Sequence, residues 1–202
     1  SDVYKRQVYD GGTTSATPPV ITIGALQGSD VAAFIQAFDT KNTGVNKILM
    51  PSGVVNDGNS GNNYSYTFTG NAVGTITVRA LTITGSATTK VYDGNTTSST
   101  SPTITGGALQ GSDIAAFTQT YDNANAGTNK TMTPAGVVND GNSGNNYTYT
   151  FTPANVGTIT GGVLTITANN QSKCHLQTLS FGNDYSVSGL IGTDNVTSVT
   201  LS

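Results

Sequence analysis

The chain contains no glutamate and no tryptophan, and it has a single cysteine and a single histidine among its 202 residues. All eleven acidic residues are aspartate. Charged residues make up 9% of the chain, against about 25% in an ordinary soluble domain. Thr, Ser, Asn and Gly stand where Glu, Lys and Arg are usual, which removes strong helix formers and adds β-branched and turn residues. The composition therefore predicts an all-β chain.

The scarce residue types also argue against several function classes. The eight basic residues are scattered and the pI is near 4.7, so we expect no nucleic-acid surface, which would need clustered Lys and Arg. No apolar run approaches the roughly 18 residues of a membrane helix, so we expect no membrane insertion. One cysteine permits no intrachain disulfide. Without Glu, and with one His and one Cys, an active site is scarcely available, and we predict no enzyme and no cofactor.

Intrinsic disorder is the competing interpretation of a chain rich in Gly and Ser. Disordered chains usually combine low hydrophobicity with high net charge and few aromatic residues. This chain has a net charge of only −3 and 7% aromatic residues, and its apolar residues recur at regular intervals. Folded β-structure is therefore favoured.

One internal repeat dominates the sequence. Residues 54–64 (VVNDGNSGNNY) reappear unchanged at 137–147, residues 24–30 (GALQGSD) at 107–113, and residues 81–84 (LTIT) at 164–167. Every pair is offset by 83 residues, so no insertion or deletion separates the copies. A unit of this length can bury a small core of its own. We predict two domains, residues 8–84 and 85–167, and the truncated start of a third at 168–202.

The first seven residues stand apart from the repeat. Residues 1–7 (SDVYKRQ) do not match their counterparts at 84–90 (TGSATTK), and they hold two of the eight basic residues. We interpret them as a non-native leader. Because the chain starts without Met or a signal peptide, we expect it to be a piece of a longer protein.

Strand patterns fill each repeat. Residues 147–151 (YTYTF) alternate aromatic residues and Thr, which places three rings on one sheet face, and residues 64–68 (YSYTF) do the same. Alternation at 75–78, 81–83, 158–160 and 164–166 predicts further strands. Residues 30–38 (DVAAFIQAF) fit a helix or a strand, and the extra Thr residues of their counterparts at 113–121 favour a strand. We predict tandem small antiparallel β-sandwich domains, immunoglobulin-like, in a linear array.

A family resemblance begins at residues 90–94 (KVYDG), followed by Thr96 and Thr97. This segment resembles the start of the YDG repeat of large bacterial adhesins of the filamentous-haemagglutinin type. Matching motifs follow in order at 125–130, 145–147 and 157–160, and in the first copy at 42–47, 62–64 and 74–77. Residues 181–182, 185–190 and 194–200 resemble the Gly-rich, mostly-β repeat (MBG type) that often accompanies YDG repeats. The Tyr-Gly pair expected there near Cys174 and His175 is missing.

The resemblance covers nearly the whole chain after residue 7 and implies β-rich repeats of a secreted protein on a bacterial surface, Gram-negative in our interpretation, without catalytic residues. We expect structural stalk or spacer repeats whose partners are neighbouring repeats of the same chain. The alternative is a module that binds host or bacterial surface glycans or proteins through its Asn/Asp/Gly-rich loops. An exposed cluster of aromatic rings would favour the binding module, whereas rings buried in a core would favour the spacer.

Three groups of residues are candidate sites. The Tyr-Asp-Gly motifs at Tyr9 and Tyr92 are predicted to be strand-ending turns, with Asp bonding its own backbone and Gly at positive φ. The loops 56–63 and 139–146 are predicted to be hairpin loops. Each offers one carboxylate, whereas calcium takes six to eight oxygens, so their residues are weak calcium candidates: Asp57, Asn59, Asp140 and Asn142. Cys174 and His175 are predicted to be a solvent-facing pair at a strand end, because adjacent strand residues point to opposite faces.

Overall fold

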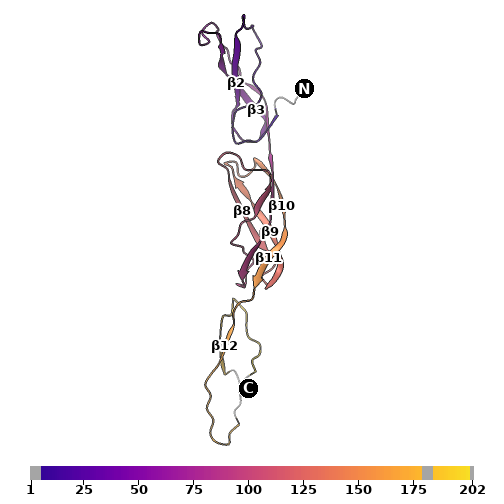
Figure 1. Cartoon of the computed structure of the whole chain (residues 1–202), viewed down its shortest axis with the longest axis vertical. Coiled ribbons are helices and arrows are strands. Elements are labelled where there is room, and N and C mark those ends of the chain that lie inside the picture. Colours follow the sequence, from indigo (N-terminus) through magenta and orange to yellow (C-terminus); the bar gives the residue numbers. More distant parts are fainter. Residues whose placement is uncertain (1–5, 179–183, 201–202) are drawn as a thin grey trace. The chain divides into compact units, whose positions relative to one another are not determined.

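The computed structural model describes residues 6–178 and 184–200, which form thirteen strands and no helix (Figure 1). The all-β prediction is confirmed. The chain divides into two compact units. The first holds the chain up to Ile83 together with Ile104–Phe117 and Ala135–Phe151, and the second holds Thr84–Thr103, Thr118–Pro134 and the chain from Thr152 on. The repeat domains 8–84 and 85–167 stay a prediction, because the first compact unit combines segments of both copies.

The first copy of the repeat forms a four-stranded sheet in the order β1 (Arg6–Val8), β4 (Asn71–Thr77), β3 (Gly44–Asn56), β2 (Val31–Phe38). β2 and β3 lie side by side as an antiparallel pair, with Val31 opposite Asn56 and Phe38 opposite Leu49 (Figure 1). The strand prediction for residues 30–38 is therefore confirmed over the helix. β3 is also antiparallel to β4.

The second copy repeats this sheet in the same order: β6 (Thr88–Val91), β11 (Ala154–Thr160), β9 (Gly127–Asn139), β8 (Ile114–Tyr121). The bounds of β2, β3 and β4 recur 83 residues later in β8, β9 and β11. The antiparallel prediction is wrong for the outer pairs, since β1 runs parallel to β4 and β6 runs parallel to β11. Parallel pairing needs a long connection rather than a tight turn, and the middle of the repeat separates these strands. An immunoglobulin-like sandwich stays a prediction.

A third sheet joins the two copies. Its order is β10 (Tyr147–Thr152), β5 (Arg79–Thr84), β7 (Thr103–Gly106), with β5 in the middle. Backbone hydrogen bonds of 3.0 Å run from Arg79 N to Asn146 O and from Gly85 N to Thr152 O, so β5 and β10 are parallel. β5 ends the first copy of the sequence repeat, whereas both of its partners belong to the second. The closing strand of one copy thereby completes a sheet of the next.

The last described strands repeat part of this arrangement. β12 (Thr165–Ala168) pairs antiparallel with β13 (Tyr185–Ser188). β12 stands where β5 stands one repeat earlier, and β13 follows it as β7 follows β5. The MBG-type third repeat stays a prediction, and its motif at residues 181–182 lies outside the described residues.

One predicted strand is absent. Residues 64–68 form no strand, although residues 147–151, with the same alternation, lie in β10. The physical reason is the partner: β10 pairs with β5, whereas no strand of the described chain is hydrogen-bonded in a sheet with residues 64–68. A single strand leaves its backbone groups unpaired, so alternation alone does not form one.

Buried apolar side chains gather in two clusters. The larger lies in the first compact unit and unites both copies: Tyr9, Phe38, Leu49, Ile76, Leu81, Ile83, Phe117, Val138 and Tyr147. The smaller lies in the second compact unit and comprises Tyr121, Met132 and Ile159, with Tyr92 packed against it. Leu81 and Ile83 of β5 are 1% and 0% exposed. The strand that is shared between copies is thus among the most deeply buried parts of the chain.

Candidate functional site

The Tyr-Asp-Gly motif forms the predicted turn in both copies. Asp10 Oδ1 accepts a hydrogen bond of 2.9 Å from Gly12 N, and Gly11 has a φ of 80°. In the second copy, Asp93 Oδ1 accepts a hydrogen bond of 3.2 Å from Asn95 N, and Gly94 has a φ of 76°. Glycine adopts such φ values without steric cost. The turn prediction is confirmed.

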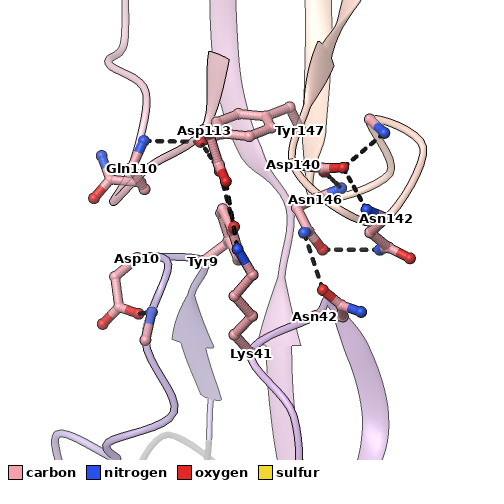
Figure 2. Close-up of polar contacts among 12 residues, drawn as sticks. Tyr9, Asp10, Lys41, Asn42, Gln110, Asp113, Asp140, Asn142, Asn146 and Tyr147 are labelled. Carbon is pink, nitrogen blue, oxygen red and sulfur yellow. Dashed lines mark hydrogen bonds and ion pairs between the residues drawn. The ribbon is translucent and has the colours of Figure 1, made fainter.

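The tyrosine of the first motif also enters a cluster around Asp113, which we call the Asp113 cluster (Tyr9, Lys41, Asp113, Tyr147). Tyr9 is fully buried, and its hydroxyl donates to Asp113 Oδ2 at 2.8 Å. Tyr147 donates to the same oxygen at 2.7 Å. Lys41 Nζ lies 3.4 Å from Asp113 Oδ1 (Figure 2). The Asp113 side chain, only 2% exposed, therefore collects two hydroxyls and an ammonium group from both copies of the repeat.

The chemistry of the Asp113 cluster suits a permanent structural contact. Hydrogen bonds to a charged acceptor are about twice as strong as neutral ones. The Tyr9 and Tyr147 rings pack edge to face, with centroids 5.4 Å apart. Burial, and then Asp113, raise the pKa of Tyr147. Burial and Asp113 likewise raise the pKa of Tyr9 against the opposing influence of Lys41. Both hydroxyls therefore stay protonated, and remain donors, at neutral pH.

The loop that follows β9 is built around the carboxylate of Asp140. Its Oδ1 accepts hydrogen bonds from Asn142 N at 2.7 Å and Gly144 N at 2.8 Å, and its Oδ2 accepts one from Asn146 N at 3.0 Å. Burial by itself would raise the pKa of Asp140, but the backbone donors Gly144, Asn142 and Asn146 together hold the pKa below its usual value. The charged carboxylate thus stabilises the loop from inside.

The four weak calcium candidates lie in this loop and its first-copy counterpart. Asp57 accepts three backbone hydrogen bonds of 2.8–3.0 Å in the same pattern as Asp140. Asn59 and Asn142 each donate their side-chain amide to the asparagine four residues on, at 2.9 Å. Among residues 6–178 and 184–200, no group of three or more His, Cys, Asp or Glu side chains is placed to hold a metal ion. The carboxylates already serve as loop acceptors, and calcium binding stays a prediction.

The hairpin prediction is wrong for both loops, because β9 and β10 lie in different sheets and because no strand follows residues 56–63 until β4. Tyr149 fixes the crossing: its hydroxyl donates to Gly144 O at 2.8 Å and accepts from Val138 N at 3.1 Å. Tyr66 makes the corresponding bonds in the first copy, at 2.9 and 3.0 Å. The loop passes from one sheet to the other since β10 finds its partner in β5, not in β9.

The second loop also contacts the first copy directly. Thr43 donates from its backbone N to Asn146 Oδ1 and from its hydroxyl to Asn145 O, each at 3.0 Å. Asn146 Nδ2 donates to Asn42 Oδ1 at 3.2 Å (Figure 2). Asn146 is fully buried, whereas its counterpart Asn63 is exposed. The first copy therefore covers Asn146 of the second loop, whereas Asn63 of the first loop stays exposed.

The remaining candidates show no assembled site. Cys174 is a free, exposed thiol, and His175 is exposed as well, as predicted. They lie in a turn rather than at a strand end, because Leu176 has a φ of 70° and Gln177 N donates to Cys174 O at 3.1 Å. Within the part of the chain that the structure describes, no helix is long and apolar enough to cross a membrane.

Sequence reasoning missed the Asp113 cluster altogether. In the sequence, Asp113 and Tyr147 are parts of the repeat and of predicted strands, and Tyr9 and Lys41 lie more than 70 positions before Asp113. Asp30 and Asp113 are one of four aspartate pairs that recur at the 83-residue offset, so the repeat alone does not single them out.

The matched family fits this geometry. The YDG domain is matched at residues 77–156. The matched range starts just before β5 and ends within β11, so the YDG domain includes the closing strand of the preceding copy. It contains Asp113 and Tyr147, whereas Tyr9 and Lys41 lie outside it and reach it from the first copy. No curated protein and no solved structure matches the chain.

Proposed function

We propose that this chain is a run of non-catalytic stalk or spacer repeats in a large secreted adhesin on a bacterial surface. The observation that carries the proposal is the Asp113 cluster, which joins consecutive copies through a buried carboxylate, two tyrosine hydroxyls and a lysine. A spacer must hold its ends apart, so contact between consecutive repeats is what its role requires. The YDG domain and the repeat motifs at both ends of it support the adhesin context.

The shared strand β5 supports the same role. Separating the two copies would break the backbone pairing of β5 with β7 and β10. It would also expose Leu81 and Ile83, which are buried among residues of both copies. In repeat proteins, such interfaces between neighbours supply much of the stability of the array. A pull along the chain would therefore be resisted by the joint as well as by each repeat.

Single-molecule force spectroscopy tests the spacer proposal. The chain is held by its two ends and stretched, and we expect a distinct unfolding event that includes the Asp113 cluster. Tyr9→Phe removes one hydroxyl from the buried carboxylate and should lower the unfolding force. Tyr64→Phe is the matched control, because Tyr64 is half-buried and lies outside this cluster. A wild-type chain that extends without a force peak would contradict the proposal.

The surface location needs a separate experiment. Antibodies raised against the chain should label intact, unpermeabilised cells of the source bacterium. Labelling that appears only after permeabilisation would contradict the surface role while leaving the mechanical result untouched.

One observation favours the alternative, a module that binds glycans or host proteins. In the first copy, the Phe34, Tyr66 and Phe68 rings form a cluster, with Tyr66 and Phe68 stacked at 5.8 Å and Phe68 40% exposed. The loop 56–63 is open nearby. A glycan array probed with the intact chain checks this alternative, and Phe68→Ala should abolish any binding. The counterpart Phe151→Ala is the control: Phe151 is 36% exposed, but it packs on Phe117, which is buried, whereas Phe68 packs on Phe34, which is only half-buried.

A further inference from the structure

The two copies differ in one part of the fold, the sheet that β5 completes. In the second copy β5 lies between β7 and β10. In the first copy the counterparts of β7 and β10 are residues 20–23 and 64–69, and neither segment forms a strand. They line an open groove with a volume of about 900 Å³. The groove therefore stands where the second copy holds a strand.

The side chains of this groove match those that β5 covers. Ile21, Phe34, Val55, Tyr66 and Phe68 line it. Ile21 is 44% exposed, whereas its counterpart Ile104 packs against the core cluster that contains Leu81 and Ile83. In the second copy, Leu81 and Ile83 of β5 fill the corresponding space. The groove of the first copy thus has the lining of a core from which one strand is missing.

We propose that this groove is a strand-acceptor site, filled by the closing strand of another YDG repeat in the register that β5 takes between β7 and β10. The occupant is a Leu-Thr-Ile-Thr strand supplied from the N-terminal side by an adjoining repeat of the same polypeptide. Its Leu and Ile enter the groove, its two Thr face outward, and its backbone pairs with residues 20–23 and 64–69. The proposal does not depend on the adhesin role.

A second set of contacts points to the same occupant. Tyr64 donates to Asp30 Oδ2 at 2.6 Å and accepts from Gln27 N at 2.9 Å. Tyr147, Asp113 and Gln110 make the same bonds in the second copy. There Tyr9 and Lys41 of the preceding copy complete the cluster, whereas in the first copy Asp30 and Tyr64 remain half-buried. Half of the joint between repeats is therefore already assembled beside the groove.

Part of the joint recurs at the other end of the chain. Tyr92, the tyrosine of the second Tyr-Asp-Gly motif, lies near Asp194, which raises the pKa of the Tyr92 hydroxyl. β12 and β13 pair there as the counterparts of β5 and β7. β12 and β13 thus repeat the pairing of β5 with β7, and the groove of the first copy is the acceptor for such a strand.

A graft tests the assignment. Residues 1–7 are replaced by a second copy of residues 77–90, which places Leu-Thr-Ile-Thr as far before residue 8 as β5 lies before residue 91. Amide hydrogen exchange is then measured at residues 20–23 and 64–69. We expect exchange to slow by about 100-fold or more, toward the rates of β7 and β10, which serve as internal standards in the same molecule. A control graft carries Leu81→Ser and Ile83→Ser in the added copy and should give no protection.

A second experiment uses a peptide, so that the proposal is still tested if the graft disturbs folding. A synthetic peptide of residues 77–86 is added to the unaltered chain, and the same amides should become protected at saturation. Unchanged exchange with both the graft and the peptide would overturn the proposal. Protection in the unaltered chain that grows with protein concentration would assign the groove to a second copy, and protection by a glycan but not by the graft would assign it to a sugar. Either result would overturn it as well.

Discussion

Single residues differ between the copies according to what covers them, and Tyr147 and Tyr64 show this most clearly. Both donate to an aspartate and accept from a glutamine backbone N, yet Tyr147 is 4% exposed and Tyr64 is half-buried. Tyr147→Phe should lower the free energy of unfolding by about 1.5–3 kcal/mol, because it removes a bond to a buried charged acceptor. Tyr64→Phe should cost less, since water can replace the bond. Urea denaturation followed by circular dichroism measures both, and equal losses would contradict the expectation.

Asp140 should make stability depend on pH. The pKa of Asp140 is lower in the folded protein than its usual value. Such a group adds stability above its unfolded pKa of about 3.9, and that contribution is lost as the pH falls through the lower folded pKa. The melting temperature should therefore fall as the pH is lowered below about 4. Asp140→Asn should be less stable at pH 7 and should show a shallower acid loss in the same scan. Parallel pH curves for the two proteins would count against this role.

At the scale of strands, the residues Leu-Thr-Ile-Thr occur in β5 and again at 164–167, where β12 begins at Thr165, but their surroundings differ. Leu81 in β5 is 1% exposed, and its counterpart Leu164 is 45% exposed. Leu81→Ala should cost about 2–5 kcal/mol, because it leaves a cavity in the larger core. Leu164→Ala should change the stability by less than about 1 kcal/mol. Thermal and urea unfolding of the two variants compare the same substitution in the same Leu-Thr-Ile-Thr sequence, so a similar loss in both would rule out β5 as the centre of that core.

The sequence predicted a strand correctly only where an alternating or β-favouring pattern coincided with a neighbouring strand to pair with. The alternation at residues 147–151 correctly predicted β10, and the extra Thr residues at 113–121 correctly favoured a strand for that segment and for its counterpart β2. The same alternation at residues 64–68 failed, because the deciding factor is a neighbouring strand, which no local pattern encodes. The parallel pairs β1–β4 and β6–β11 and the crossing at Tyr149 escaped prediction for the same reason. The Tyr-Asp-Gly turn was predictable, since its bonds span only two residues.

At the scale of the whole chain, two choices of domain boundary define different cooperative folding units. The internal repeat predicts residues 85–167, whereas the YDG domain begins at residue 77 and so includes β5. We call these two choices of domain boundary frames. Repeat length alone cannot choose between the frames, since any stretch of 83 residues contains one copy of every repeated motif. The placement of Leu81 and Ile83 in the core with Phe117 and Tyr147 favours the frame that starts before β5.

Two fragments of equal length separate these frames. Residues 77–160 contain β5 through β11, and residues 85–168 contain β6 through β12. The first should unfold cooperatively and be more stable by about 3–6 kcal/mol, because burial of a Leu and an Ile side chain contributes about 1.5–3 kcal/mol each. Urea denaturation of both fragments measures the difference. If residues 85–168 proved equally stable, β12 would have folded back into the place of β5, and the joint between repeats would be an exchangeable strand rather than a fixed one.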